Sequence, residues 1–67
     1  MKELTPNDAN TFFNYLENEY PEINCQLRNY SFVNGSIVCF KPAKMTNEDY
    51  DKYNEILKKW LTDNGFM

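Results

Sequence analysis

Residues 30–40 decide the fold, and they read YSFVNGSIVCF. Two runs rich in aromatic and β-branched residues flank Asn34-Gly35, and such runs favour extended strands. An Asn-Gly pair readily supplies the two positive φ angles that a type I′ turn requires. The stretch therefore predicts an antiparallel hairpin, which ends before Pro42 because proline cannot continue a paired strand.

An amphipathic helix is predicted before the hairpin, over about residues 5–20. Thr5 is a suitable N-cap, and Pro6 fits the first helical position, where a missing N–H has no consequence. Pro21 ends the helix because the residue before a proline disfavours the helical conformation. The apolar stripe at helical spacing comprises Ala9, Phe12, Phe13, Leu16 and Tyr20.

A second amphipathic helix is predicted after the hairpin, over about residues 46–64. Thr46 is its N-cap, with Asp49 three residues further on as the capping-box acid. Gly65 suits the left-handed position that follows a helix, and Phe66 would then fold back onto the last turn. The buried stripe comprises Tyr50, Tyr53, Leu57, Trp60 and Leu61.

The segment between the first helix and the hairpin also has an extended pattern. Ile23, Cys25 and Leu27 alternate with polar residues, which is typical of a half-buried strand. A turn near residues 28–29 would then give three strands. The sequence thus predicts a small α+β fold, one domain over residues 1–67, in the order α-β-β-α with α-β-β-β-α as the alternative. The two amphipathic helices pack on the antiparallel hairpin or meander.

Both faces of the hairpin are apolar. A two-residue turn pairs Phe32 with Ile37 and Tyr30 with Cys39 on one face. The opposite face carries Val33, Val38 and Phe40. If both helices cover one face, the other is an exposed apolar patch of the kind that marks an interaction site. If the helices take one face each, or a bulge turns every apolar side chain inward, no patch remains.

The composition argues against catalysis. The 67 residues include no His, the commonest general base at neutral pH and the commonest metal ligand. Cys25 and Cys39 have no metal-ligand spacing, and we expect both to be buried free thiols. The acids Asp51 and Glu55 share a helix face but fit a solvated surface better than a metal site. We therefore expect no enzyme activity, no cofactor and no metal.

The start of the sequence, MKELTP, lacks the hydrophobic stretch of a signal peptide. No apolar run is long enough to span a bilayer. We therefore expect a cytoplasmic protein that does not engage membranes.

Charge is distributed unevenly along the chain. The net charge is −4 over residues 1–22, +3 over residues 23–45 and −2 over the remainder, which gives −3 in total. Arg28, Lys41 and Lys44 could contact phosphate while bases stack on nearby rings, which makes nucleic-acid binding the alternative function. The negative total charge and the single Arg argue against it.

The sequence therefore favours a small acidic protein-interaction module. We expect a protein partner, or a second copy in a homodimer, to bind the hairpin face or a sheet edge. The predicted contact residues are Tyr30, Phe32 and Ile37, with Tyr15 as a flanking aromatic. The element order and the acidic surface are similar to those of small accessory proteins, including inhibitors, of phages and mobile elements. Ten asparagines in 67 residues fit an AT-rich genome, where such proteins are common.

Overall fold

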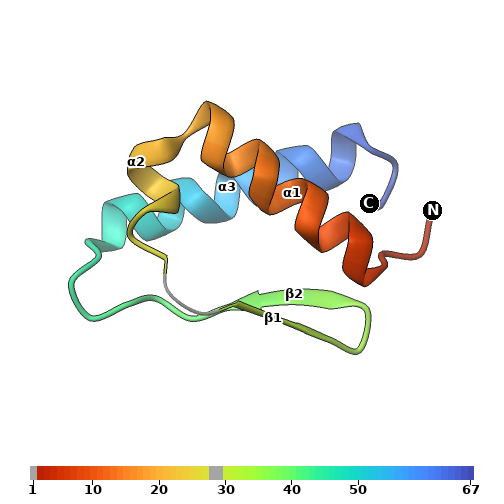
Figure 1. Ribbon diagram of the computed structural model, residues 1–67, viewed down its shortest axis with the longest axis horizontal. Coiled ribbons are helices and arrows are strands. Elements are labelled where there is room, and N and C mark those ends of the chain that lie inside the picture. The colour runs from red at the N-terminus through yellow and green to blue at the C-terminus, as the bar shows by residue number, and fades with distance from the viewer. Residues whose placement is uncertain (1, 28–29) are drawn as a thin grey trace.

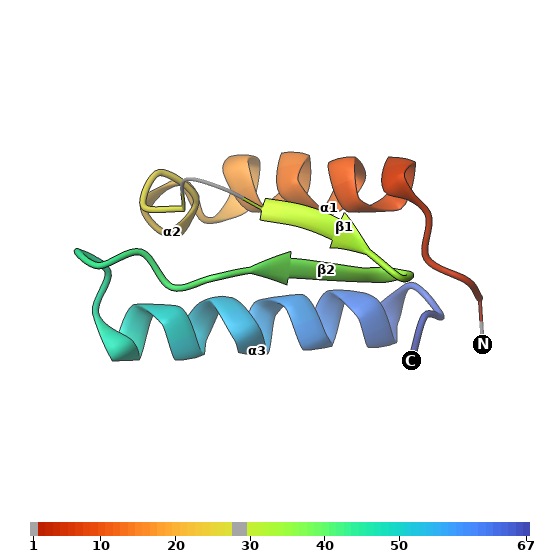
Figure 2. The same ribbon diagram turned by 90° about the horizontal axis from the view of Figure 1, so that it is seen from below.

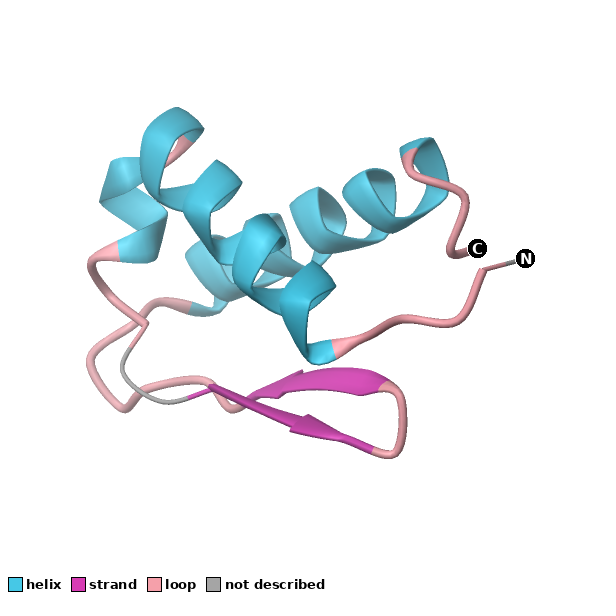
Figure 3. Ribbon diagram, turned by 45° about the vertical axis from the view of Figure 1, so that its right-hand side comes forward, coloured by secondary structure: helices cyan, strands magenta, loops and turns pink. Residues whose placement is uncertain are grey.

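The computed structural model describes residues 2–27 and 30–67. The elements are α1 (Pro6–Glu19), α2 (Pro21–Asn24), β1 (Tyr30–Val33), β2 (Ser36–Cys39) and α3 (Asn47–Asp63). Helices α1 and α3 form one layer and the β1–β2 hairpin forms the other (Figures 1 and 3). Seen from the hairpin side, the two strands lie between α1 and α3 (Figure 2). The predicted α+β fold with the order α-β-β-α is confirmed.

Helix α1 begins with a complete capping box. The Thr5 hydroxyl accepts a hydrogen bond from the Asp8 backbone N–H at 3.3 Å. In return, the Asp8 carboxylate accepts from the Thr5 backbone N–H at 2.9 Å and from the Thr5 hydroxyl at 2.8 Å. These bonds satisfy amide groups that the first helical turn leaves without partners. The helix therefore begins where the sequence predicted.

The hairpin has the predicted register. Tyr30 pairs with Cys39 and Phe32 with Ile37. Its turn has φ angles of 51° at Asn34 and 78° at Gly35, both in the left-handed region. A two-residue turn of this kind matches the right-handed twist of the strands.

The core lies between the helical layer and the inward face of the hairpin. Phe12 and Leu16 of α1 are fully buried, and Tyr53 of α3 is 1% exposed. The buried residues packed into this cluster are Phe12, Phe13, Leu16, Ile23, Cys39, Met45 and Tyr53. Aromatic rings occupy much of the cluster, and the Phe12 ring contacts those of Phe13 and Trp60 at centroid distances of 5.0 and 5.3 Å.

The strand predicted over Ile23, Cys25 and Leu27 is wrong. Residues 21–24 form the helical turn α2, in which the Cys25 N–H donates to the Pro21 carbonyl at 2.9 Å. On a helical path Ile23 and Leu27 share a face, because they are four residues apart. Both pack against the core, whereas Cys25 lies between them in sequence and is exposed. The expectation that Cys25 is buried is therefore also wrong, whereas Cys39 is buried as expected.

The end of α3 lies beside the N-terminal segment. Gly65 has a φ of 83°, and the Phe66 N–H donates to the Leu61 carbonyl at 2.8 Å, which is a Schellman ending. The Phe66 ring stacks on Trp60 at a centroid distance of 5.7 Å. The Lys2 backbone N–H donates to the Gly65 carbonyl at 2.9 Å, and the Lys2 ammonium lies 4.8 Å from the Phe66 ring.

Across residues 2–27 and 30–67, no helix has both the length and the apolar character that a membrane span requires.

Candidate protein-interaction surface

The inward face of the hairpin is largely occupied by the protein's own helices. Cys39 is 8% exposed and belongs to the core, and Ile37 packs against that core. The Tyr30 ring stacks on Phe13 of α1 at a centroid distance of 3.7 Å and an angle of 18°. Phe32 shares this face through its pairing with Ile37 and is half-buried. The predicted contact residues Tyr30, Phe32 and Ile37 all lie on this inward face, where Tyr30 remains 45% exposed and Phe32 and Ile37 are half-buried.

Among the described residues, no helix or strand covers the opposite face of the hairpin (Figures 1 and 3). Val33 is 48% exposed, and Val38 is half-buried. Phe40 follows Val38 by two residues and is 81% exposed, which is unusual for so large an apolar side chain. We call Val33, Val38 and Phe40 the outer patch.

The two edges of the hairpin differ. In a hairpin with a two-residue turn, the N–H and C=O groups of Ile37 and Cys39 point outward from β2. The Tyr50 hydroxyl of α3 donates to the outward Cys39 carbonyl at 2.7 Å. The N–H and C=O groups of Tyr30 and Phe32 point outward from β1 in the same way. Helix α3 therefore satisfies part of the β2 edge.

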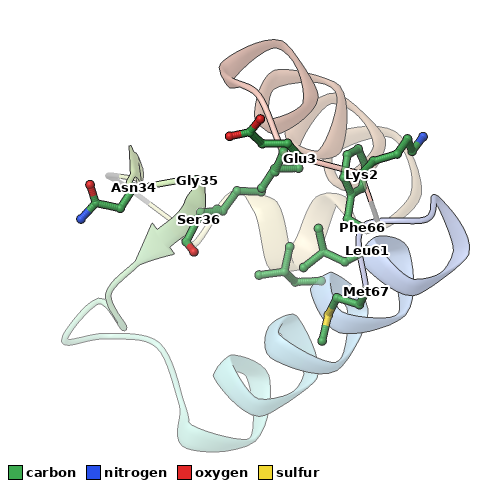
Figure 4. A pocket seen from close by; sticks show the side chains of 11 residues that line it. Lys2, Glu3, Asn34, Gly35, Ser36, Leu61, Phe66 and Met67 are labelled. Atoms are coloured by element: carbon green, nitrogen blue, oxygen red, sulfur yellow. The ribbon is translucent and has the colours of Figure 1, made fainter.

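An open groove separates the hairpin turn from the two chain ends (Figure 4). It encloses about 580 Å³. Its apolar lining comprises Leu4, Ile37, Leu57, Leu61, Phe66 and Met67. Polar groups of Lys2, Glu3 and Asn34 also line it. Ile37 therefore keeps one accessible side, although the rest of its side chain packs against the core.

Tyr15 lies apart from the hairpin. Its ring is 36% exposed and meets Tyr20 edge-on at 6.2 Å. Both rings line a hollow of about 210 Å³ between α1 and α3, to which no hairpin residue contributes. Desolvation raises the pKa of Tyr15, with smaller contributions from Tyr20 and Glu19. Tyr15 therefore lies on a different part of the surface from the other predicted contact residues.

The predicted nucleic-acid residues do not form one described site. Arg28 lies outside the described residues. Lys41 and Lys44 are exposed on the segment after β2. Lys41 approaches the Pro42 carbonyl at 3.5 Å, and Lys44 lines a hollow of about 520 Å³ together with Met45 and other residues. Because Tyr30 is stacked on Phe13, one face of its ring is not available to a base.

The carboxylates lie on the protein surface or support local structure. Asp51 and Glu55 are exposed on α3. Asp49 accepts a hydrogen bond from the Gln26 side-chain amide at 3.1 Å, which connects the start of α3 to the segment after α2. Within the described parts of the chain, no three Cys, Asp or Glu side chains gather in a way that could hold a metal ion.

Val33, Val38 and Phe40 are recognisable from the sequence as one face of the hairpin, whereas the predicted contact residues belong to the other face. Two serines, Ser31 and Ser36, indicate in the sequence which face is turned to solvent. They share the face of Val33 and Val38, whereas the four inward positions are all apolar or aromatic. A face that contains serines is the better choice for the solvent side.

Comparisons with protein-family models, curated proteins and solved structures found no match to this chain.

Proposed function

We propose that this protein is a non-catalytic interaction module that binds a protein partner through the outer patch of its hairpin. The observation that carries the proposal is the exposure of Phe40, at 81%, on the hairpin side that also carries Val33, at 48%. Large apolar side chains grouped on one face commonly anchor protein interfaces.

Burial of the outer patch in a complex would be energetically favourable. Each square ångström of apolar surface removed from water contributes about 25 cal/mol. An aromatic side chain that is exposed in the free protein and buried in a complex can therefore contribute a large share of the binding energy. Phe40 has no role in the core that would explain its size, because the core cluster does not include it.

The charge of the chain supports a protein partner over a nucleic acid. The net charge is −3, and the acidic residues lie mainly in the segments of α1 and α3. A negative surface repels phosphate backbones but can attract a basic protein surface. We propose that the protein acts in the cytoplasm, as an accessory protein or inhibitor of phage or mobile-element type. The sequence pattern supports this part of the proposal.

The proposal is tested by affinity capture from nuclease-treated cytosol of the source organism. The bait proteins are the wild type, a Val33→Ser/Phe40→Ser double variant and a Tyr15→Ser control. We expect a stoichiometric protein partner with the wild type and the control but not with the double variant. Circular dichroism establishes that each bait is folded.

Two outcomes would overturn this proposal. A partner that the double variant retains but Tyr15→Ser loses would place the interface between α1 and α3. Recovery of nucleic acid alone, once nuclease is omitted, would favour the basic segment around Lys41 and Lys44.

A further inference from the structure

Strand β1 has an edge suited to pairing with another strand. The N–H and C=O groups of Tyr30 and Phe32 point away from β2, because Val33 and Ser36 form the hydrogen-bonded pair next to the turn. Natural proteins usually block such an edge with a charged residue or a proline. The four residues of β1, YSFV, include neither.

Helix α1 lies above the space beside this edge. Asn10, Phe13, Asn14 and Glu17 follow the helical spacing i, i+3, i+4, i+7, and together with Tyr30 they line a hollow of about 400 Å³. In Figure 2, β1 is the strand on the α1 side of the hairpin. A further strand would lie about 4.8 Å from β1 and beneath this stripe of α1. We call this space the β1 lane.

The residues that line the β1 lane favour particular side chains on an incoming strand. Asn10 and Asn14 supply side-chain amides and Glu17 a carboxylate, and Asn24 adds a third amide. Their oxygens accept hydrogen bonds from Lys or Arg, and the carboxylate adds charge attraction. Residues 1–22, which include α1, have a net charge of −4. Alternate side chains of the incoming strand point toward α1, so these should be basic.

The same charges argue against a second copy as the occupant. Antiparallel pairing of two β1 edges around a two-fold axis would bring two α1 helices onto the same side of the joined sheet. Each belongs to a segment with a net charge of −4, and like charges brought together disfavour association.

From this arrangement we infer that the β1 lane binds an extended segment of the partner protein, with Lys or Arg at alternate positions, as an added strand. The inference rests on the proposed function and specifies the partner's chemistry. The outer patch and the β1 lane adjoin on one hairpin, so one partner can contact both.

The test uses a capped peptide of about six residues that alternates lysine and valine, a usual strand length. The reference peptide has glutamate in place of lysine. Binding is followed by NMR of isotope-labelled protein. We expect the lysine peptide to shift the Phe32 backbone amide and the Asn10 and Asn14 side-chain amides. It should also slow hydrogen exchange at the Phe32 N–H, whereas the glutamate peptide should do neither.

Two variants separate the β1 lane from general attraction between charges. Glu17→Gln should weaken binding of the lysine peptide about two- to fivefold, as expected for the loss of one exposed ion pair. Glu19→Gln is the matched control, because Glu19 is an exposed acid of the same helix that does not line this hollow. It should leave the affinity unchanged. The chain is short enough for chemical synthesis, and N-methylation of Phe32 should abolish binding by removing the outward donor.

Several results would overturn the inference. If Glu17→Gln and Glu19→Gln weakened peptide binding equally, the binding would depend on net charge and not on the β1 lane. Absence of peptide binding would exclude the added strand. Exchange protection at Phe32 that rises with protein concentration, without peptide, would identify a second copy as the occupant. If capture of the partner requires Phe40 but is unaffected by N-methylation of Phe32 and by Glu17→Gln, the proposed function stands and the inference about the β1 lane is wrong. If no protein is captured at all, the proposed function itself fails.

Discussion

The Tyr50 hydroxyl donates a hydrogen bond to the Cys39 carbonyl at 2.7 Å, and this bond ties helix α3 to the outward edge of strand β2. The Cys39 side chain meanwhile lies in the core. The two contacts of this one residue hold the inward face of the hairpin against the helices. The outer patch is exposed for the same reason, because a hairpin held in this orientation turns Val33 and Phe40 to solvent.

Removing the Tyr50 hydroxyl should destabilise the fold. In Tyr50→Phe, the Cys39 carbonyl loses its donor while the ring is retained. We expect the free energy of unfolding to fall by about 1 kcal/mol, which is typical for one hydrogen bond. Urea unfolding followed by circular dichroism measures it. An unchanged urea midpoint would mean that the bond does not secure β2.

Removing the Tyr53 hydroxyl, in contrast, should not destabilise the fold. This oxygen is buried and has no hydrogen-bond partner among the described residues. Its burial, with the Cys39 thiol nearby, raises the pKa of Tyr53. An unsatisfied buried hydroxyl destabilises a fold, so Tyr53→Phe should leave the free energy of unfolding unchanged or raise it by up to about 1 kcal/mol.

Tyr50→Phe and Tyr53→Phe control for each other, because both remove one oxygen from the same helix. A loss in Tyr53→Phe as large as that in Tyr50→Phe would contradict this account and indicate that the Tyr53 hydroxyl has a partner.

The orientation of the hairpin predicts different effects of serine on its two faces. Ile37 packs against the core, so Ile37→Ser should reduce the free energy of unfolding by about 2 kcal/mol or more. Phe40 is 81% exposed, so Phe40→Ser should change it by less than about 0.5 kcal/mol. Thermal and urea unfolding of both variants provide the comparison. The reverse order would mean that the hairpin presents its other face to the helices.

The capping box at Asp8 predicts a dependence of stability on pH. Hydrogen bonds from the Thr5 hydroxyl and backbone N–H lower the pKa of Asp8. A carboxyl group with a lowered pKa in the folded state stabilises the protein above its unfolded pKa, and this contribution is lost as the pH falls through the folded pKa. Between about pH 6 and about pH 3, wild type should therefore lose more stability than Asp8→Asn. Parallel loss in the two proteins would contradict the prediction.

The two cysteines should differ in reactivity. Cys25 is exposed, whereas Cys39 is buried and its thiol has a pKa raised by desolvation. Titration of native protein with a thiol-specific chromogenic reagent should show one fast thiol and one that reacts only as the protein opens. Cys25→Ser should remove the fast phase. Two fast thiols in the native protein would contradict the burial of Cys39.

The parts of the fold that the sequence predicted depend on neighbouring residues. Asn34-Gly35 determines the hairpin turn, and that turn determines the strand register. Thr5 and Asp8 set the start of α1 through bonds within one helical turn. Such signals act over three or four residues, so a single sequence is sufficient to read them.

The parts that sequence did not predict depend on packing between distant segments. Ile23 and Leu27 fit a strand or a helical turn equally well by pattern, and burial against the core favours the turn. The choice of hairpin face depends on contacts such as that between Tyr30 and Phe13, which are remote in sequence. The β1 lane exists because residues 21–24 form a helical turn rather than a third strand.

The most direct test of the interaction proposal is site-specific photocrosslinking in cells of the source organism. Phe40 is replaced by the photoreactive amino acid p-benzoylphenylalanine, and Lys58, exposed on α3, is replaced in the same way as the control. We predict that illumination joins the protein to one partner from position 40 and not from position 58. Equal crosslinking from both positions, or none from position 40, would contradict the proposal that the outer patch binds a protein partner.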